Sequence, residues 1–80
     1  MDLDDFRRIA DAHYKARSGI ARQIRKDARI SMAEVAAALD VSESAVSRWE
    51  SGSRLPRGET AIRWARLLDE LERINQPAVA

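Results

Sequence analysis

The short distance between two helix starts constrains the fold of this chain more than any other feature of its sequence. Ser31 and Glu34 have the spacing of a capping box, in which each side chain accepts a hydrogen bond from the backbone N–H of the other residue. The run that follows Ser31 is rich in alanine and favours a helix that ends near Asp40. Ser42 can then cap the next helix. The pattern predicts two short helices that meet across a tight turn.

Three further segments carry apolar residues at helical spacing. The first begins at Asp2 or Asp4 and ends near Arg17, and its apolar residues are Leu3, Phe6, Ile9, Ala10 and Tyr14. The second is expected to have Ser18 as its cap and an i, i+4 stripe made of Ile20, Ile24 and Ala28. The last begins near Gly58 and runs to Asn75, with an apolar side of Ala61, Ile62, Trp64, Ala65, Leu68 and Leu71.

The helix that starts at Ser42 is expected to end near Ser51, because Gly52 can adopt the left-handed conformation of a C-terminal cap. A loop that contains Pro56 follows. We therefore predict an all-α fold, a compact bundle of about five helices that contains a helix-turn-helix. Eighty residues suit one domain, so a single domain is expected over residues 1–80.

Charge is distributed unevenly along the chain. The formal net charge is only +1, but residues 7–66 hold 13 of the 14 basic residues and seven of the 13 acidic ones, a balance of +6. The remaining acids lie near the two ends. A cationic middle could meet a polyanion, although the solvated surface of an ordinary helical domain explains the charge equally well.

Several classes of function are excluded or disfavoured by what the sequence contains. With no cysteine, the chain can form neither a disulfide nor a cysteine-based zinc site. His13 is the single histidine, and no nucleophile, base, phosphate loop or metal spacing accompanies it, so we expect no enzyme, no metal and no cofactor. Apolar runs of a few residues fall far below the roughly 20 that span a membrane, and the N-terminus is acidic. A cytoplasmic protein is expected.

The helix that starts at Ser42 has one slim polar side. If Val46 and Trp49 face inward with Val35, Leu39 and Val41, the outward residues are Glu43, Ser44, Ser47, Arg48 and Ser51. Two short helices across a turn form a helix-turn-helix, whose second helix can lie in the major groove of DNA. That groove is about 12 Å wide, so short hydroxyl side chains permit close approach to the bases.

The stretch "ISMAEVAAALDVSESAVSRWESGSRLP" resembles the phage repressor and Cro family of helix-turn-helix proteins, also called the xenobiotic-response-element type. Val46-Ser47-Arg48-Trp49-Glu50, followed by Gly52 and Pro56, is the most specific part. The resemblance covers about two thirds of the chain. It implies a family core at residues 18–75, an extra N-terminal helix at residues 1–17, and a recognition helix at residues 42–51 that binds double-stranded DNA.

The resemblance also assigns contacts. It implies that Glu43, Ser44, Ser47 and Arg48 contact bases, and that phosphates are met by Ser31, Met32, Ser42, Ser51, Ser53, Arg54 and Arg57. Arg48 would donate to guanine O6 and N7, which is worth about 1–3 kcal/mol of discrimination. Glu43 either accepts from a cytosine amino group or stabilises the start of its helix, and the two alternatives stay open.

Two positions depart from the family pattern. Met32 stands where the family usually has glutamine, so its contact is expected to be apolar or through the backbone only. Asp40 stands where the family usually has glycine in the turn, and it can adopt the left-handed conformation at some cost. The resemblance further implies a partly buried ion pair between Arg25 and Glu50. Trp49 and Trp64 are expected in the core.

The two end helices are assigned from their residues. We expect the N-terminal helix to cover the bundle, with phosphate contacts from Arg17 and Arg22; the alternative is that its cations, including Arg7, Arg8 and Lys15, follow a phosphate backbone. His13 is expected at the surface or between helices. A homodimer contact is expected in the last helix at Leu67, Leu71 and Ile74, which would suit a palindromic operator.

These features together favour a prokaryotic or phage transcriptional regulator, best interpreted as a repressor that blocks access to a promoter. The expected partner is a double-stranded DNA operator, with no small-molecule ligand and no membrane. The alternative is an antitoxin or another protein-interaction module that uses the same fold.

Overall fold

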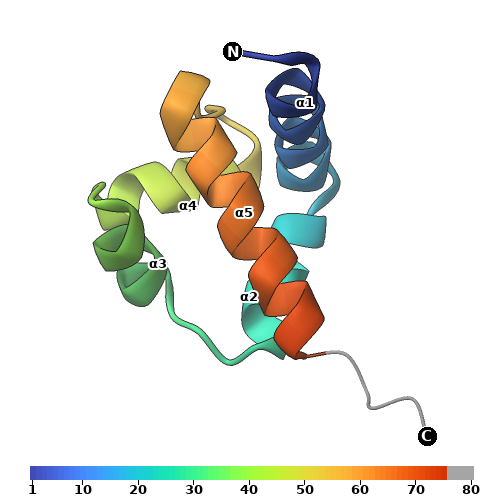
Figure 1. The fold of residues 1–80 in the computed structure, drawn as a ribbon. Coiled ribbons are helices and arrows are strands. Elements are labelled where there is room, and N and C mark those ends of the chain that lie inside the picture. The colour runs from blue at the N-terminus through green and yellow to red at the C-terminus, as the bar shows by residue number, and fades with distance from the viewer. Residues whose placement is uncertain (76–80) are drawn as a thin grey trace, which may run out of the picture.

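The computed structural model describes residues 1–75, and in that range it contains five α-helices. They are α1 (Leu3–Ser18), α2 (Ile20–Asp27), α3 (Met32–Leu39), α4 (Glu43–Ser51) and α5 (Gly58–Ile74). Figure 1 shows α5 crossing the middle of the molecule, with α1 on one side and the pair α3 and α4 on the other. The predicted all-α bundle with a helix-turn-helix is confirmed. No described helix is long and apolar enough to cross a membrane.

The core forms around α5, whose predicted apolar side is buried throughout. Trp64 is the largest fully buried side chain, and its ring lies 5.2 Å from that of Trp49 between centroids, at a tilt of 52°. Such a tilted pair is a favourable arrangement of two aromatic rings. Small side chains fill the remaining helix contacts, with Ala12, Ala16 and Ala21 almost completely buried. The two tryptophans therefore belong to the core.

The two short helices and their turn follow the local sequence signals. In the capping box, Glu34 N–H donates to Ser31 Oγ and Ser31 N–H donates to Glu34 Oε1, both at 3.0 Å. Asp40 ends α3 in the left-handed conformation, with φ 55° and ψ 48°. Ser42 caps α4 by accepting from Ala45 N–H at 3.1 Å. These caps place the start of α4 directly after the turn, as predicted.

A long-range contact that local patterns do not reveal supports the end of α3. Arg63 of α5 donates from Nη1 to the carbonyl of Leu39 and from Nη2 to that of Ala38, each at 3.2 Å. The last carbonyls of a helix lack partners within the helix, so a guanidinium there replaces the missing donors. Arg63 thus fixes α3 to the central helix.

The N-terminal helix has the predicted limits but buries a different face. Asp2 caps it, in a capping box with Asp5, and it ends at Ser18. The apolar face expected at Leu3, Phe6 and Tyr14 is wrong, because these side chains are exposed and Ala12 and Ala16 are buried instead. Close packing of α1 on α5 needs small residues at the contact, and it turns the large apolar side chains toward solvent.

The start of α2 also differs from the prediction. Ser18 is the last residue of α1, and Gly19 both ends α1 and precedes α2, with φ 82°. Glycine adopts this left-handed conformation without a steric penalty, whereas serine would be strained in it. The break between α1 and α2 therefore falls at Gly19, one residue later than expected. The buried stripe shifts with it, because Ala21 and Arg25 are buried and Ile20 is exposed.

Ion pairs complete the contact between α1 and α5. Arg8 Nη1 lies 3.0 Å from Asp69 Oδ2, and Lys15 Nζ lies 2.8 Å from Glu72 Oε1. Burial lowers the pKa of Lys15, but hydrogen bonds to Glu72 and Asp11 outweigh it and raise that pKa above its usual value. The structure therefore uses Arg8 and Lys15 within the bundle, in line with a packing role for the N-terminal helix.

Candidate nucleic-acid interface

The exposed side of α4 is the polar side that the sequence indicates. Val46, Trp49 and Glu50 are buried, and they fix the rotation of the helix against the bundle. Glu43, Ser44, Ser47, Arg48 and Ser51 are all exposed. A helix anchored in this way presents short hydroxyls, one carboxylate and one guanidinium on a single surface. These are the side-chain types that read base edges in a major groove.

A buried ion pair holds α2 against α4 behind this surface. Arg25 Nε lies 2.6 Å from Glu50 Oε2, and Arg25 Nη2 lies 2.9 Å from Glu50 Oε1. A third bond runs from Arg25 Nη1 to the carbonyl of Ile30 at 2.9 Å. The side chains are 10% and 6% exposed, and the hydrogen bonds to Glu50 raise the pKa of Arg25. The two hydrogen bonds from the guanidinium to the carboxylate, with the third to Ile30, fix the position of α4 relative to the loop before α3.

A groove of about 240 Å³ lies directly in front of this ion pair. Arg22, Met32, Ser47 and Ser51 line it together with the two paired residues. The groove thus brings together residues from α2, α3 and α4. Arg22, Met32 and Ser51 are predicted for phosphate contact and Ser47 for base contact. Met32 is half-buried and its side chain packs on the core, so the polar groups of the groove come from the other positions.

The loop after α4 is held by its own hydroxyls. Ser51 Oγ donates to the carbonyl of Arg48 at 3.0 Å and lies 2.9 Å from Ser53 Oγ. Arg54 N–H donates to the same carbonyl at 3.3 Å. His13 Nε2 lies 2.9 Å from the carbonyl oxygen of Pro56, to which it donates, so the loop is also fixed to α1. His13 therefore lies between structural elements and positions the loop that carries Arg54.

Five arginines remain available on this side of the molecule. None of the ion pairs found within residues 1–75 involves Arg17, Arg22, Arg48, Arg54 or Arg57. All five side chains are exposed. The backbone at Arg17 lies beside the end of α4, because a Cβ added to Gly52 would be 3.6 Å from Arg17 Cα. Guanidinium groups from α1, α2, α4 and the loop, none of them in these ion pairs, thus surround α4.

Comparison with known families decides what this arrangement is. The model of the family described as Helix-turn-helix matches residues 22–73, which is more than half of the chain. The chain belongs to the phage repressor and Cro type of helix-turn-helix proteins. Members of this family bind double-stranded DNA, and the chain is a DNA-binding domain of the transcription-regulator type. Neither the search of curated proteins nor the search of solved structures found a match.

The helix-turn-helix match starts within α2, so α1 lies outside the matched residues. Within the family core, Arg25 and Glu50 form the ion pair that the resemblance implies. Arg63 is a supporting residue that the sequence did not indicate, and His13, expected at the surface or between helices, has a partner in Pro56 that the sequence did not indicate. Both act on backbone carbonyls far away in the sequence, and such contacts leave no local pattern.

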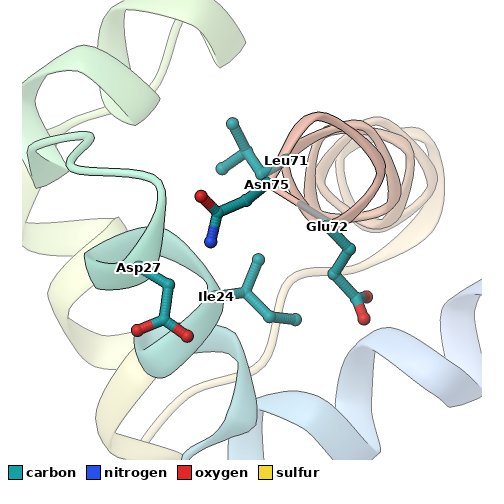
Figure 2. A pocket seen from close by; sticks show the side chains of 5 residues that line it. All are labelled: Ile24, Asp27, Leu71, Glu72 and Asn75. Atoms are coloured by element: carbon teal, nitrogen blue, oxygen red, sulfur yellow. The ribbon is translucent and has the colours of Figure 1, made fainter. Parts of the chain in front are cut away.

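A second pocket lies away from α4, between α2 and α5. Figure 2 shows Ile24 and Asp27 on one side of it and Leu71, Glu72 and Asn75 on the other. Its volume is about 180 Å³. The residues that line this pocket include two carboxylates and no basic side chain, so the pocket itself does not suit a phosphate group.

The three residues of the expected dimer contact in α5 differ in their exposure. Leu71 is only 8% exposed, because it packs inside its own chain, and Leu67 packs partly against the core. Ile74 is 68% exposed. Of the three residues, only Ile74 offers a largely free apolar side chain to a second copy.

Proposed function

We propose that this domain binds a specific double-stranded operator with α4 in the major groove and that it represses transcription by blocking access to a promoter. The single observation that carries this proposal is the exposed polar side of α4, held by Val46 and Trp49 and surrounded by unpaired arginines. We further propose that it acts in the cytoplasm of a bacterium or of a phage-infected cell.

Base reading is proposed for Glu43, Ser44, Ser47 and Arg48. Arg48 is the one long donor of the four, and its fork matches the O6 and N7 acceptors of guanine. The three shorter side chains let the helix approach the base edges closely. Glu43 also lies in the first turn of α4, where a carboxylate stabilises the helix N-terminus, so both of its proposed roles are compatible with its position.

Phosphate contacts are proposed on both sides of α4. Ser31 and Met32 lie at the N-terminus of α3, where free backbone N–H groups favour an anion, and Met32 would contribute through its backbone. Ser42 occupies the same place at α4. The other proposed contacts are Arg22 and Ser51 in the groove, Ser53, Arg54 and Arg57 in the loop, and Arg17 in the last turn of α1. The hydroxyls of Ser51 and Ser53 already bond to each other, so the arginines are expected to contribute most of the affinity.

Two copies on a palindromic site remain part of the proposal. A two-fold arrangement would place two recognition helices about 34 Å apart, one turn of DNA. Ile74 is the exposed residue of the set Leu67, Leu71 and Ile74 that would take part.

Fluorescence anisotropy of duplex DNA tests the proposal. Affinity for a random duplex pool is expected to fall steeply with salt, because each neutralised phosphate releases bound counterions. Arg54→Ala should weaken binding to every sequence to a similar extent and flatten the salt slope. Arg73→Ala is the matched control, since Arg73 is paired with Glu70 in the last turn of α5.

The result that overturns the proposal is an absence of binding to any duplex at low salt. That outcome would favour the alternative, an antitoxin or other protein-interaction module that uses the fold without DNA. Selection of bound sequences from a random duplex library gives the second readout. The repressor proposal expects one enriched motif, and two inverted copies of it if the protein binds as a dimer.

A further inference from the structure

The side of α1 that faces away from the bundle carries an apolar stripe. Leu3, Phe6 and Tyr14 are 82%, 56% and 57% exposed, and Ala10 is exposed between them. These positions recur every three or four residues and so lie on one face of the helix. Single exposed apolar side chains are ordinary, whereas three large ones aligned on one helix mark a contact surface.

We propose that a second copy of this chain covers the stripe, with the two α1 helices packed antiparallel about a two-fold axis at Ala10. The axis would place Ala10 of each copy against the other, where a methyl side chain allows the helices to approach closely. Phe6 of each copy would then meet Tyr14 of the other, because both residues are four positions from the axis. Leu3 would pack on the aliphatic part of Arg17 of the second copy, because both residues are seven positions from Ala10.

The charges of α1 favour the antiparallel direction. Its first turn is acidic, with Asp4 and Asp5 after the capping Asp2, and its last turn is basic, with Lys15 and Arg17. Antiparallel packing brings the acidic end of each copy next to the basic end of the other, so the dimer has two such contacts. A parallel pair would instead set like charges together at both ends. Lys15 is already paired to α5, so Arg17 is the main free cation at this end.

The size of the contact predicts a reversible dimer. Sixteen residues of helix form a surface about 24 Å long and about 10 Å wide. This is a few hundred Å², below the roughly 800 Å² per partner of a standard stable interface. Self-association is therefore expected to depend on concentration and to weaken as salt screens the end-to-end charge pairs.

The same arrangement has a consequence that rests on the proposed function. Arg17 adjoins the end of α4, and in the antiparallel pair the two copies of Arg17 lie at opposite ends, about 21 Å apart along the helix axis. In this pair the contact through α1, in place of the one through Ile74 of α5, would set the spacing of the two α4 helices. Self-association itself is measured without DNA, so a failure of this inference is distinct from a failure of DNA binding.

Cysteine cross-linking tests the two-fold axis directly, because the chain has no cysteine of its own. Ala10→Cys should form a disulfide-linked dimer at least about tenfold faster under mild oxidation than Ala38→Cys, since a two-fold axis brings the two thiols within bonding reach. Ala38 is the matched control, an exposed alanine on α3. Equal rates for the two variants would overturn the proposal.

Sedimentation equilibrium without DNA gives an independent readout. The unmodified chain should approach twice its monomer mass as concentration rises, and Ala10→Arg should stay monomeric because it opposes two guanidinium groups on the axis. Ala38→Arg should associate like the unmodified chain, and circular dichroism should show all three proteins folded, since both alanines are exposed. A chain that stays monomeric throughout, or an Ala10→Arg variant that still dimerises, would refute the α1 interface.

Discussion

Glu50→Ala removes the carboxylate that accepts two of the three hydrogen bonds of Arg25. The side chain of Arg25 is only 10% exposed. Water therefore cannot replace the lost hydrogen-bond acceptors unless the structure opens locally. Removing one partner of a buried pair costs about 3–5 kcal/mol, because the remaining charge is left uncompensated. We expect Glu50→Ala to lower the free energy of unfolding by this amount.

The loss should be visible as a large shift in thermal stability. For a domain of this size, each kcal/mol corresponds to about 4–8 °C in Tm, so Glu50→Ala should melt at least about 12 °C below the parent protein. Urea unfolding is the second assay. The buried contact between Trp49 and Trp64 makes fluorescence a reporter of the core, and circular dichroism reports the helices.

The double variant Arg25→Met with Glu50→Leu distinguishes two costs. One is the cost of leaving a buried charge without its partner, and the other is the loss of the attraction between the two charges. The double variant removes both charges and fills the space with apolar groups, which is often neutral relative to a buried ion pair. The carbonyl of Ile30 loses its donor, which should cost about 1 kcal/mol. The double variant is therefore expected to be more stable than Glu50→Ala alone. A loss below about 1 kcal/mol for Glu50→Ala, the range of surface pairs, would refute the reasoning, as would a double variant that is no more stable.

Two further predictions concern helix ends. Arg63→Met should lower the free energy of unfolding by about 1–2 kcal/mol, because the carbonyls of Ala38 and Leu39 lose their donors, and Arg66→Met is the control in urea unfolding. Backbone and hydroxyl hydrogen bonds from Ser31 hold the pKa of Glu34 below its usual value. The capping box therefore stabilises the fold above the ordinary pKa of about 4.3 and loses its effect as pH falls through the lowered value. NMR titration of Glu34 should show this lowered pKa and a partial rise of it in Ser31→Ala, which removes the hydroxyl and keeps the backbone N–H. An unchanged titration would contradict the contribution of the hydroxyl.

The part of the fold that sequence reasoning predicted best is encoded locally. The capping box at Ser31, the cap at Ser42 and the glycine at position 52 each act within a few residues, so spacing alone indicates where α3 and α4 begin and end. The exposed side of α4 follows from the same positions, once Val46 and Trp49 face the core.

The orientation of α1 could not be read in the same way. Its large apolar residues suggest one buried face, but the helix packs through Ala12 and Ala16 and through the ion pairs of Arg8 and Lys15. Which face is buried depends on the room that α5 leaves, and that is a tertiary property. The guanidinium of Arg63 is a similar case, because its carbonyl partners lie on a different helix.

The central claim is that Arg48 reads sequence from the exposed side of α4. The most direct measurement is the affinity of Arg48→Ala for the duplex selected by the parent protein, compared with its affinity for random DNA at the same salt concentration. The account predicts a loss of about 1–3 kcal/mol on the selected duplex, relaxed preference at one base position, and a much smaller loss on random DNA. Equal losses on the two DNAs would contradict it, since Arg48 would then contact only the backbone.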